Sequence, residues 1–268
     1  RFDAALAAEG ITCAVCHVQD GVVLGPWGDS ARAPHPVRKA PSLLTEKKCA
    51  ECHQATAAYT DTLVCNFDTA EEWRRSSYFA RGRSCSSCHM PEVTRAVAPG
   101  GPARRSRRHL FIGAKIPKEK DIPDAHRRFY DLFSPGLTVE ILSGPSPLKL
   151  RLTNSGAGHR LPTGDPERFI LVKAALLDAK GAALDQQTYR IGQVWVWHPT
   201  ARKVSDNSLK PHEQRRIEMH LVAPRAARPA RLRLVVENWR MSAENAAYHN
   251  LTDYPLSAVV FQTEKALP

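Results

Sequence analysis

The chain has 268 residues, and its composition of 43% hydrophobic and 24% charged residues excludes a disordered or fibrous protein. Its 38 Lys and Arg residues outnumber its 27 Asp and Glu residues, so the formal net charge is +11 and favours an anionic partner. Aromatic residues make up only 7%, and the sequence carries no recognisable nucleic-acid-binding motif, so we expect no nucleic acid among the partners.

The first third of the chain contains three copies of the pattern Cys-x-x-Cys-His, which is typical of c-type haem attachment. In that chemistry two thiols form thioethers with the vinyl groups of one haem, and the adjacent histidine binds the iron as its proximal ligand. The sequence therefore predicts three covalently bound haem c groups. The motif cysteines are Cys13, Cys16, Cys49, Cys52, Cys85 and Cys88, and the predicted proximal histidines are His17, His53 and His89.

Other uses of paired cysteines fit this pattern less well. A disulfide framework would not place histidine after the second cysteine of every pair, and a zinc site would combine one Cys-x-x-Cys pair with another. Because thioether attachment takes place outside the cytoplasm, we expect an exported bacterial protein, periplasmic or extracellular. We also expect that a signal peptide has been removed ahead of Arg1.

The segments between the motifs are rich in proline and poor in strand patterns. The motifs begin at equal intervals, but the intervening segments share no further likeness, which argues against a solenoid. We therefore expect residues 1–135 to form a haem-packed trihaem domain of short helices and loops.

The pattern changes after Pro135, where apolar and polar residues alternate as in half-buried strands. A hairpin turn is expected at Asp178–Gly181. About seven short strands separated by turn signals predict an antiparallel β-sandwich of immunoglobulin-like type over residues 136–268. The expected strands are Leu137–Leu142, Leu148–Leu152, Phe169–Leu177, Tyr189–Trp197, Arg216–Val222, Arg231–Val236 and Leu256–Phe261.

Three segments resemble a family of multihaem c-type cytochromes related to the tetrahaem cytochrome of ammonia oxidisers and to hydroxylamine oxidoreductase. Glu71–Pro91 has the acidic-Trp, Ser-x-Tyr, Gly and CxxCHMP sequence of that group, and Arg107–Gly113 has its Arg-x-His-x-Phe-x-Gly sequence. Asn154–Gly164 is similar to the GHxxPTG segment near the start of β-sandwich domains in several such cytochromes. The chain departs from the best-known relatives, which carry four or eight haems, and it lacks the Lys-type catalytic haem motif.

Each proximal histidine leaves a sixth position on iron, and we expect His35, His109 and His159 to fill these positions as distal ligands. His35 lies between two prolines, which hold the backbone extended, and His109 occupies the histidine of the Arg-x-His-x-Phe-x-Gly match. His159 lies in a glycine-containing loop that can approach a flat macrocycle closely, and the resemblance also implies this role. The alternative for each is an ordinary loop histidine, and His126 is a weaker candidate.

These features predict a trihaem cytochrome that transfers electrons through closely spaced bis-His haems, with no catalytic residue assigned. Two alternatives stay open: a haem enzyme acting on a small nitrogen or sulfur compound at one open haem, and a subunit of a polymeric extracellular cytochrome or larger membrane-associated redox complex. The expected partners are redox proteins with acidic docking surfaces. The basic run Arg104–Arg108 can dock such a partner, lie in solvent or neutralise haem propionates, and Cys65 is interpreted as a buried inert thiol.

Overall fold

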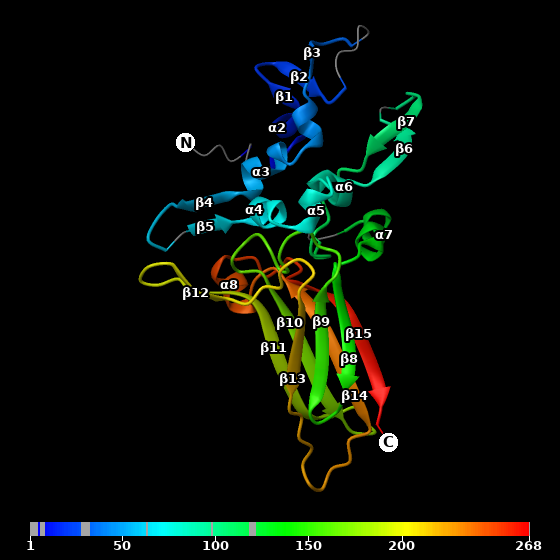
Figure 1. Ribbon diagram of the computed structural model, residues 1–268, viewed down its shortest axis with the longest axis vertical. Helices are drawn as coiled ribbons and strands as arrows, with labels where there is room; N and C mark the ends of the chain where they lie inside the picture. Colours follow the sequence, from blue (N-terminus) through cyan, green and yellow to red (C-terminus); the bar gives the residue numbers. More distant parts are fainter. Residues whose placement is uncertain are drawn as a thin grey trace. The chain divides into compact units, whose positions relative to one another are not determined.

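The computed structural model describes residues 5, 9–27, 33–62, 64–97, 99–117 and 122–267, without the side chains of residues 125, 126 and 132 (Figure 1). The chain forms two compact units, and we describe each by itself. Unit 1 comprises Arg1–His53 and Gly82–Leu110, and unit 2 comprises Gln54–Arg81 and Phe111–Pro268. Among the described residues, no helix is long and apolar enough to cross a membrane.

The compact units do not divide at residue 135. Residues 54–81 and 111–135 belong to the unit that contains the predicted β-sheet region. One reason is a set of hydrogen bonds between residues far apart in the sequence, such as that from Thr163 Oγ1 to Glu72 Oε2 at 2.7 Å. The division into a haem domain and a sandwich domain at residue 135 concerns where cofactors bind, and it stays a prediction.

Unit 1 consists of one-turn or two-turn helices and short strands. The helices are α2 (Cys13–His17), η1 (Pro41–Leu44), α3 (Lys47–His53) and α6 (Cys85–His89), and the strands are β1 (Val18–Gln19), β2 (Val22–Gly25), β3 (Val37–Lys39), β6 (Glu92–Ala96) and β7 (Ala103–Arg107). Strand β2 pairs antiparallel with β1 and parallel with β3, and β6 and β7 form an antiparallel hairpin.

Short helices carry the three motifs as predicted, but the prediction of short helices and loops before residue 135 missed the short strands that are also present. The turn between β1 and β2 shows what was overlooked. Asp20 and Gly21 have φ angles of 53° and 72°, as the two central residues of a type I′ hairpin turn require. An Asp-Gly pair is a recognised hairpin signal, even where the flanking strands are too short to show alternation.

Unit 2 contains a two-sheet body, which we define as Leu137–Ala266, together with smaller elements. The smaller elements are the hairpin of β4 (Ala55–Ala58) and β5 (Val64–Phe67) and the helices α4 (Thr69–Arg74), α5 (Ser77–Ala80) and α7 (Asp124–Leu132). The strands of the body are β8 (Leu137–Ser143), β9 (Leu148–Asn154), β10 (Phe169–Leu177), β11 (Ala183–Val196), β12 (Arg202–Asp206), β13 (Gln214–Met219), β14 (Arg231–Trp239) and β15 (Ser257–Ala266), with α8 (Ala243–Tyr248) before the last.

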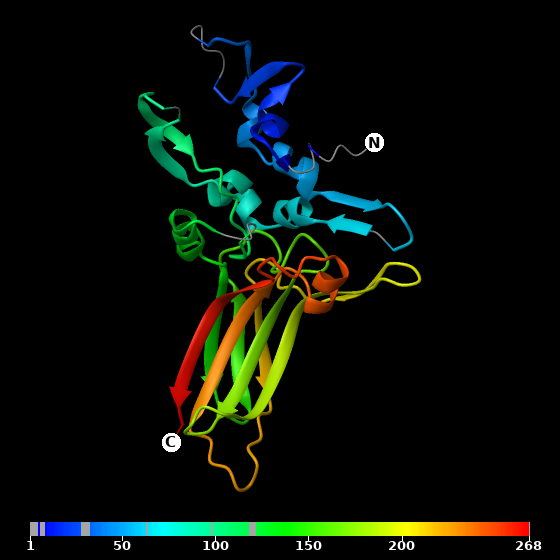
Figure 2. The same cartoon turned by 180° about the vertical axis from the view of Figure 1, so that it is seen from behind.

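These strands form two antiparallel sheets, with the orders β12-β11-β10-β14-β15 and β13-β9-β8. The smaller sheet faces the viewer in Figure 1 and the larger sheet in Figure 2, so the sheets lie in two layers. All seven predicted strand regions contain a strand, and Gly181 N donates to Asp178 O in the predicted turn. Strand β12 was not predicted, because its five residues are all exposed and show no alternation of hydrophobicity.

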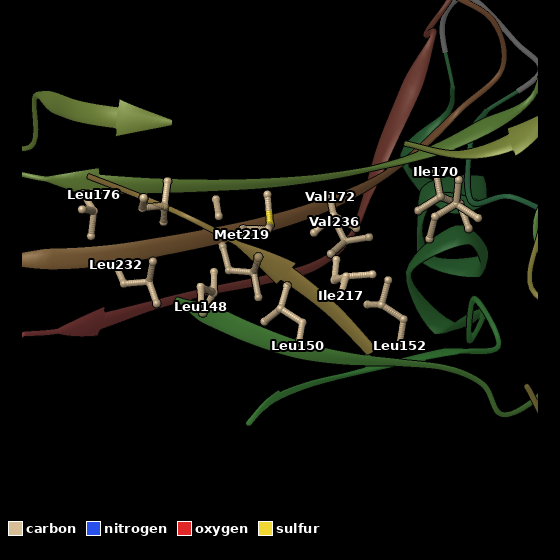
Figure 3. Packing of buried hydrophobic residues seen from close by; sticks show 14 of the residues in the cluster. Leu148, Leu150, Leu152, Ile170, Val172, Leu176, Ile217, Met219, Leu232 and Val236 are labelled. Atoms are coloured by element: carbon tan, nitrogen blue, oxygen red, sulfur yellow. The ribbon is translucent and has the colours of Figure 1, made fainter. Parts of the chain in front are cut away.

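The core of the body lies between the two sheets (Figure 3). Alternate residues of β9, namely Leu148, Leu150 and Leu152, are fully buried, and β10 and β14 face them with their own apolar side chains. This is the burial that the alternating sequence predicts, since successive strand residues point to opposite faces. The body therefore folds around an ordinary side-chain core.

Candidate functional site

The three Cys-x-x-Cys-His motifs all lie on short helices of unit 1. Each motif forms the end of its helix, with the histidine as the last helical residue of α2, α3 and α6. Residues three and four positions apart lie on the same side of a helix, so each helix presents its two cysteines and its histidine together. The local structure thus supplies the arrangement that the predicted attachment requires.

The ring of His17 is oriented by a backbone carbonyl. Its Nδ1 lies 3.0 Å from Leu24 O, on strand β2, and Leu24 is buried. With Nδ1 as the donor, the lone pair is on Nε2, which is the tautomer that a metal-binding histidine uses when its other nitrogen is hydrogen-bonded.

His109 is held in the same way and lies close to His17. Its Nδ1 lies 3.0 Å from Arg107 O, and the ring centroids of His17 and His109 are 6.0 Å apart with an interplanar angle of 50°. Two imidazoles that bind one metal ion from opposite sides have ring centres about 6 Å apart, because each metal–nitrogen bond is about 2 Å and each ring centre lies about 1 Å beyond its nitrogen. The structure therefore brings one predicted proximal ligand and one predicted distal ligand to the separation of an axial pair.

The cysteines of different motifs also approach each other. No disulfide joins any of the seven cysteines, all of which are among the described residues. The Cys49 and Cys85 thiols are hydrogen-bonded, and this contact lowers the pKa of Cys49 to about 7 while it raises that of Cys85. Burial raises the pKa of Cys16. The charge of Lys48 lowers it in part, and that of Cys49 raises it further. The attachment points of the second and third motifs are therefore adjacent, and that of the first motif is near them.

The chemistry of unit 1 fits covalently bound haem. It offers thiol pairs, oriented imidazoles and apolar side chains such as Ile11, Val15 and Trp27 that the protein itself leaves exposed. Among its described residues, Leu24 is the one buried hydrophobic side chain. A large apolar macrocycle next to these residues would provide the burial that a folded unit needs. In the described part of the chain, unit 1 included, no three His, Cys, Asp or Glu side chains are arranged to hold a bare metal ion.

The other predicted ligands of unit 1 lie on its helices and loops. His53 is exposed at the end of α3, and His89 is half-buried at the end of α6. His35 is exposed in the loop before β3. Their roles as iron ligands stay predictions. His126 belongs to α7, but its side chain is outside the described residues.

His159 lies in unit 2, in a loop held in place by the buried Asn154 and the half-buried Glu72. Asn154, which is fully buried, donates through Nδ2 to His159 O at 2.8 Å and accepts from Ala157 N at 3.1 Å. Glu72 Oε2 accepts hydrogen bonds from Arg160 N and from Thr163 Oγ1, at 3.1 and 2.7 Å. The His159 ring has its Nδ1 2.8 Å from Arg160 O, so the lone pair is again on Nε2 when Nδ1 donates.

Two segments that carry the family resemblance thus contact each other within unit 2. A Cβ atom at Gly158 would lie 3.1 Å from Trp73 Cδ1 and 3.2 Å from Tyr78 Cβ, so glycine lets both aromatic rings pack on the loop. Burial raises the pKa of Glu72 above the ordinary glutamate range, although the hydrogen bonds from Thr163 and Arg160 oppose this. The sequence did not identify Glu72 as a buried residue. Its signal in the sequence was its place in the acidic-Trp part of the Glu71–Pro91 match.

Comparisons with known proteins give one structural similarity. No protein-family model matches the chain, and no curated protein matches it. The crystal structure of a penta-haem cytochrome c552 from Thermochromatium tepidum is similar, with a TM-score of 0.58 and 17% sequence identity, over 87% of this chain and 59% of that chain. The chain therefore spans less than two thirds of that protein, and at this identity the similarity shows the fold alone. The chain thus shares the fold of that cytochrome over the matched part, and the relation to the hydroxylamine oxidoreductase group stays a prediction.

Proposed function

We propose that this protein is an electron-transfer cytochrome that carries three covalently bound haem c groups. The observation that carries the proposal is the 6.0 Å separation of His17 and His109, together with the three helical Cys-x-x-Cys-His motifs. The fold shared with a penta-haem cytochrome c552 supports the same function. When bound, haem c supplies an iron centre that accepts and releases one electron.

In this proposal His17 and His109 are the residues that would hold one haem iron between them. The carbonyls of Leu24 and Arg107 fix the tautomer and orientation of these rings and make their Nε2 atoms more basic. Two basic nitrogens stabilise the ferric state and leave no open position on that iron, which suits electron transfer better than catalysis on a small molecule. His53 and His89 are the proposed proximal ligands of the other two haems, and His35 is a proposed distal ligand in the same unit. The role of His159, in unit 2, stays a prediction.

The contact between Cys49 and Cys85 supports rapid exchange of electrons between cofactors. Thioethers formed at these two positions would bring the edges of two haems together, and electron-tunnelling rates fall exponentially with distance. The partners that donate and accept these electrons would be redox proteins. We further propose that the protein works outside the cytoplasm, where thioether attachment takes place.

The optical and electron paramagnetic resonance spectra of the purified ferric protein test this function. We expect all haems to be low-spin and to show no change on addition of cyanide or nitrite, because each iron has two histidine ligands. High-spin features with a spectral shift on adding either anion would contradict the proposal and favour the alternative of a haem enzyme with one open haem. Size-exclusion chromatography and electron microscopy would show whether the protein assembles into a polymer.

A further inference from the structure

The hairpin of β6 and β7 connects the third motif with His109. Strand β6 begins at Glu92, shortly after His89, and β7 ends at Arg107, two residues before His109. In the proposed function both histidines bind iron, so this hairpin is a segment of unit 1 that joins two iron ligands along the chain.

The base of the hairpin is fixed to the helix of the third motif. Arg107 Nη1 donates to Ser86 O at 3.2 Å and to Met90 O at 3.0 Å, which are a residue of α6 and the residue that follows it. Glu92 accepts from Arg105 Nη2 at 2.7 Å and from Arg107 Nη2 at 3.2 Å. These contacts give Arg107 and Glu92 a structural role and hold the hairpin in one place on α6.

Farther along the hairpin two arginines lie directly opposite each other. The register pairs Arg95 with Arg104, and both are exposed. Side chains of directly opposed residues are on the same face of the hairpin, and like charges at such positions destabilise it. Glu92 is the single carboxylate in the sequence of both strands and their connection, and it contacts Arg105 and Arg107. The two arginines therefore repel each other, and an anion supplied by another molecule would relieve this repulsion.

We propose that Arg95 and Arg104 form a docking surface for the carboxylate-rich face of an acidic redox protein. The assignment of a redox partner rests on the proposed electron-transfer function, whereas the docking surface rests on the hairpin. The pair lies three register positions beyond Glu92 and Arg107, which is about 10 Å at the rise of a strand residue. Guanidinium groups match carboxylates in a two-pronged geometry, and the net charge of +11 steers an acidic protein toward the chain.

The variant that tests this is Arg95→Thr/Arg104→Thr. A pair of opposed threonines is favourable in an antiparallel hairpin, so this change removes the charges without weakening the strands. The matched control is Arg225→Thr/Arg228→Thr in the loop between β13 and β14, which lowers the net charge by the same amount. A third variant, Arg95→Lys/Arg104→Lys, keeps both charges.

The probe is an acidic flavodoxin, used beside the same flavodoxin with its surface carboxylates amidated. Calorimetric titration of the oxidised proteins measures binding without electron transfer. We expect the Arg95→Thr/Arg104→Thr variant to raise Kd about tenfold and to reduce the salt dependence of binding, because two interfacial charges are lost. The Arg225→Thr/Arg228→Thr control should stay within about twofold, the lysine variant should lie near the wild type, and the amidated probe should not bind.

Three results would overturn the docking surface. Equal weakening in the hairpin variant and the control would mean that only net charge matters. A shift in haem potentials or spectrum of the Arg95→Thr/Arg104→Thr variant without probe would mean that the arginines neutralise haem propionates. Binding to vesicles of phosphatidylcholine and phosphatidylglycerol but not to flavodoxin would assign the hairpin to a membrane surface. Failure of the proposed function would appear separately, as high-spin haems in the wild type without any probe.

Discussion

Unit 1 and the two-sheet body differ in what holds them together. The body encloses a cluster of fifteen buried hydrophobic residues contributed by both sheets, whereas Leu24 is the one buried hydrophobic residue among the described residues of unit 1. The body can therefore be stabilised by side-chain packing alone. Unit 1 has no comparable core among its described residues and carries oriented histidines and paired thiols instead. We therefore infer that its stability depends on the cofactors that these residues would bind.

The largest effect should follow from withholding haem. Protein made in cells that lack the haem-attachment machinery should lose the structure of unit 1 and keep the two-sheet body. Hydrogen exchange should show no protection at α2, α3 and α6, while β9, β10 and β14 keep protection set by a global stability of about 5–15 kcal/mol. Equal protection of α3 and α6 with and without haem would contradict the inference that the stability of unit 1 depends on haem.

The number of haems attached to the mature protein tests the assignment of the three motifs. The intact mass of denatured wild-type protein should include three haem c groups, because thioethers survive denaturation. Replacing both Cys49 and Cys52 with serine should remove one of the three and leave the body folded. A wild-type mass that shows fewer than three haems would refute the assignment of the motifs.

A cavity in the core of the body tests the comparison from the other side, because it weakens the packing that stabilises the body and leaves the haem-attachment residues unchanged. Leu234 on β14 is fully buried, so Leu234→Ala should lower the free energy of unfolding of the body by about 2–5 kcal/mol. Val259→Ala on β15, where the valine is 48% exposed, should cost less than about 1 kcal/mol. Urea unfolding followed by far-ultraviolet circular dichroism measures both. If Leu234→Ala also lowered the haem count, the independence of the two kinds of stabilisation would be disproved.

The same contrast explains what the sequence could predict. Alternation over Leu148–Leu152 marked the strand that the structure has there, because burial on one face of a sheet imposes that period, and the apolar run Phe169–Leu177 marked another with its exact bounds. In unit 1 the strands are two to five residues long, which is too short for alternation to appear. The Cys-x-x-Cys-His motifs were visible because the spacing of their residues is itself the requirement of the chemistry.

Contacts between distant residues could not be predicted in this way. The sequence named His109 as a distal ligand but did not say that it would lie beside His17. Glu71 and Glu72 are adjacent and chemically identical, yet Glu71 pairs with Arg75 on the surface whereas Glu72 is buried against Arg160 and Thr163. Partners about 90 positions away decide that difference, and no local pattern contains it.

A smaller change tests the pair of histidines in unit 1. His109→Ala should leave three haems attached, convert one of them partly to high spin and raise its reduction potential, because a basic nitrogen that favours ferric iron is lost. Added imidazole should restore the low-spin spectrum. His220→Ala, which removes an exposed histidine of the body, is the control and should change neither property. An unchanged spectrum and redox titration in His109→Ala would exclude this residue as a ligand.

The smallest effect should come from Glu72, whose pKa is raised by burial. A carboxyl whose pKa is higher in the folded than in the unfolded state stabilises the fold at low pH, and this contribution is lost as the pH rises through the folded-state pKa. The relevant window begins near the ordinary glutamate value of about 4.3 and extends above it. Glu72→Gln carries no titrating proton, so the unfolding free energy of the wild type minus that of Glu72→Gln should decrease as the pH rises through this window. Glu71→Gln removes a carboxylate one residue away on the same helix and controls for the loss of charge. Urea unfolding of the three proteins at several pH values measures the difference, and a pH-independent difference for Glu72→Gln would show that burial does not perturb this carboxyl.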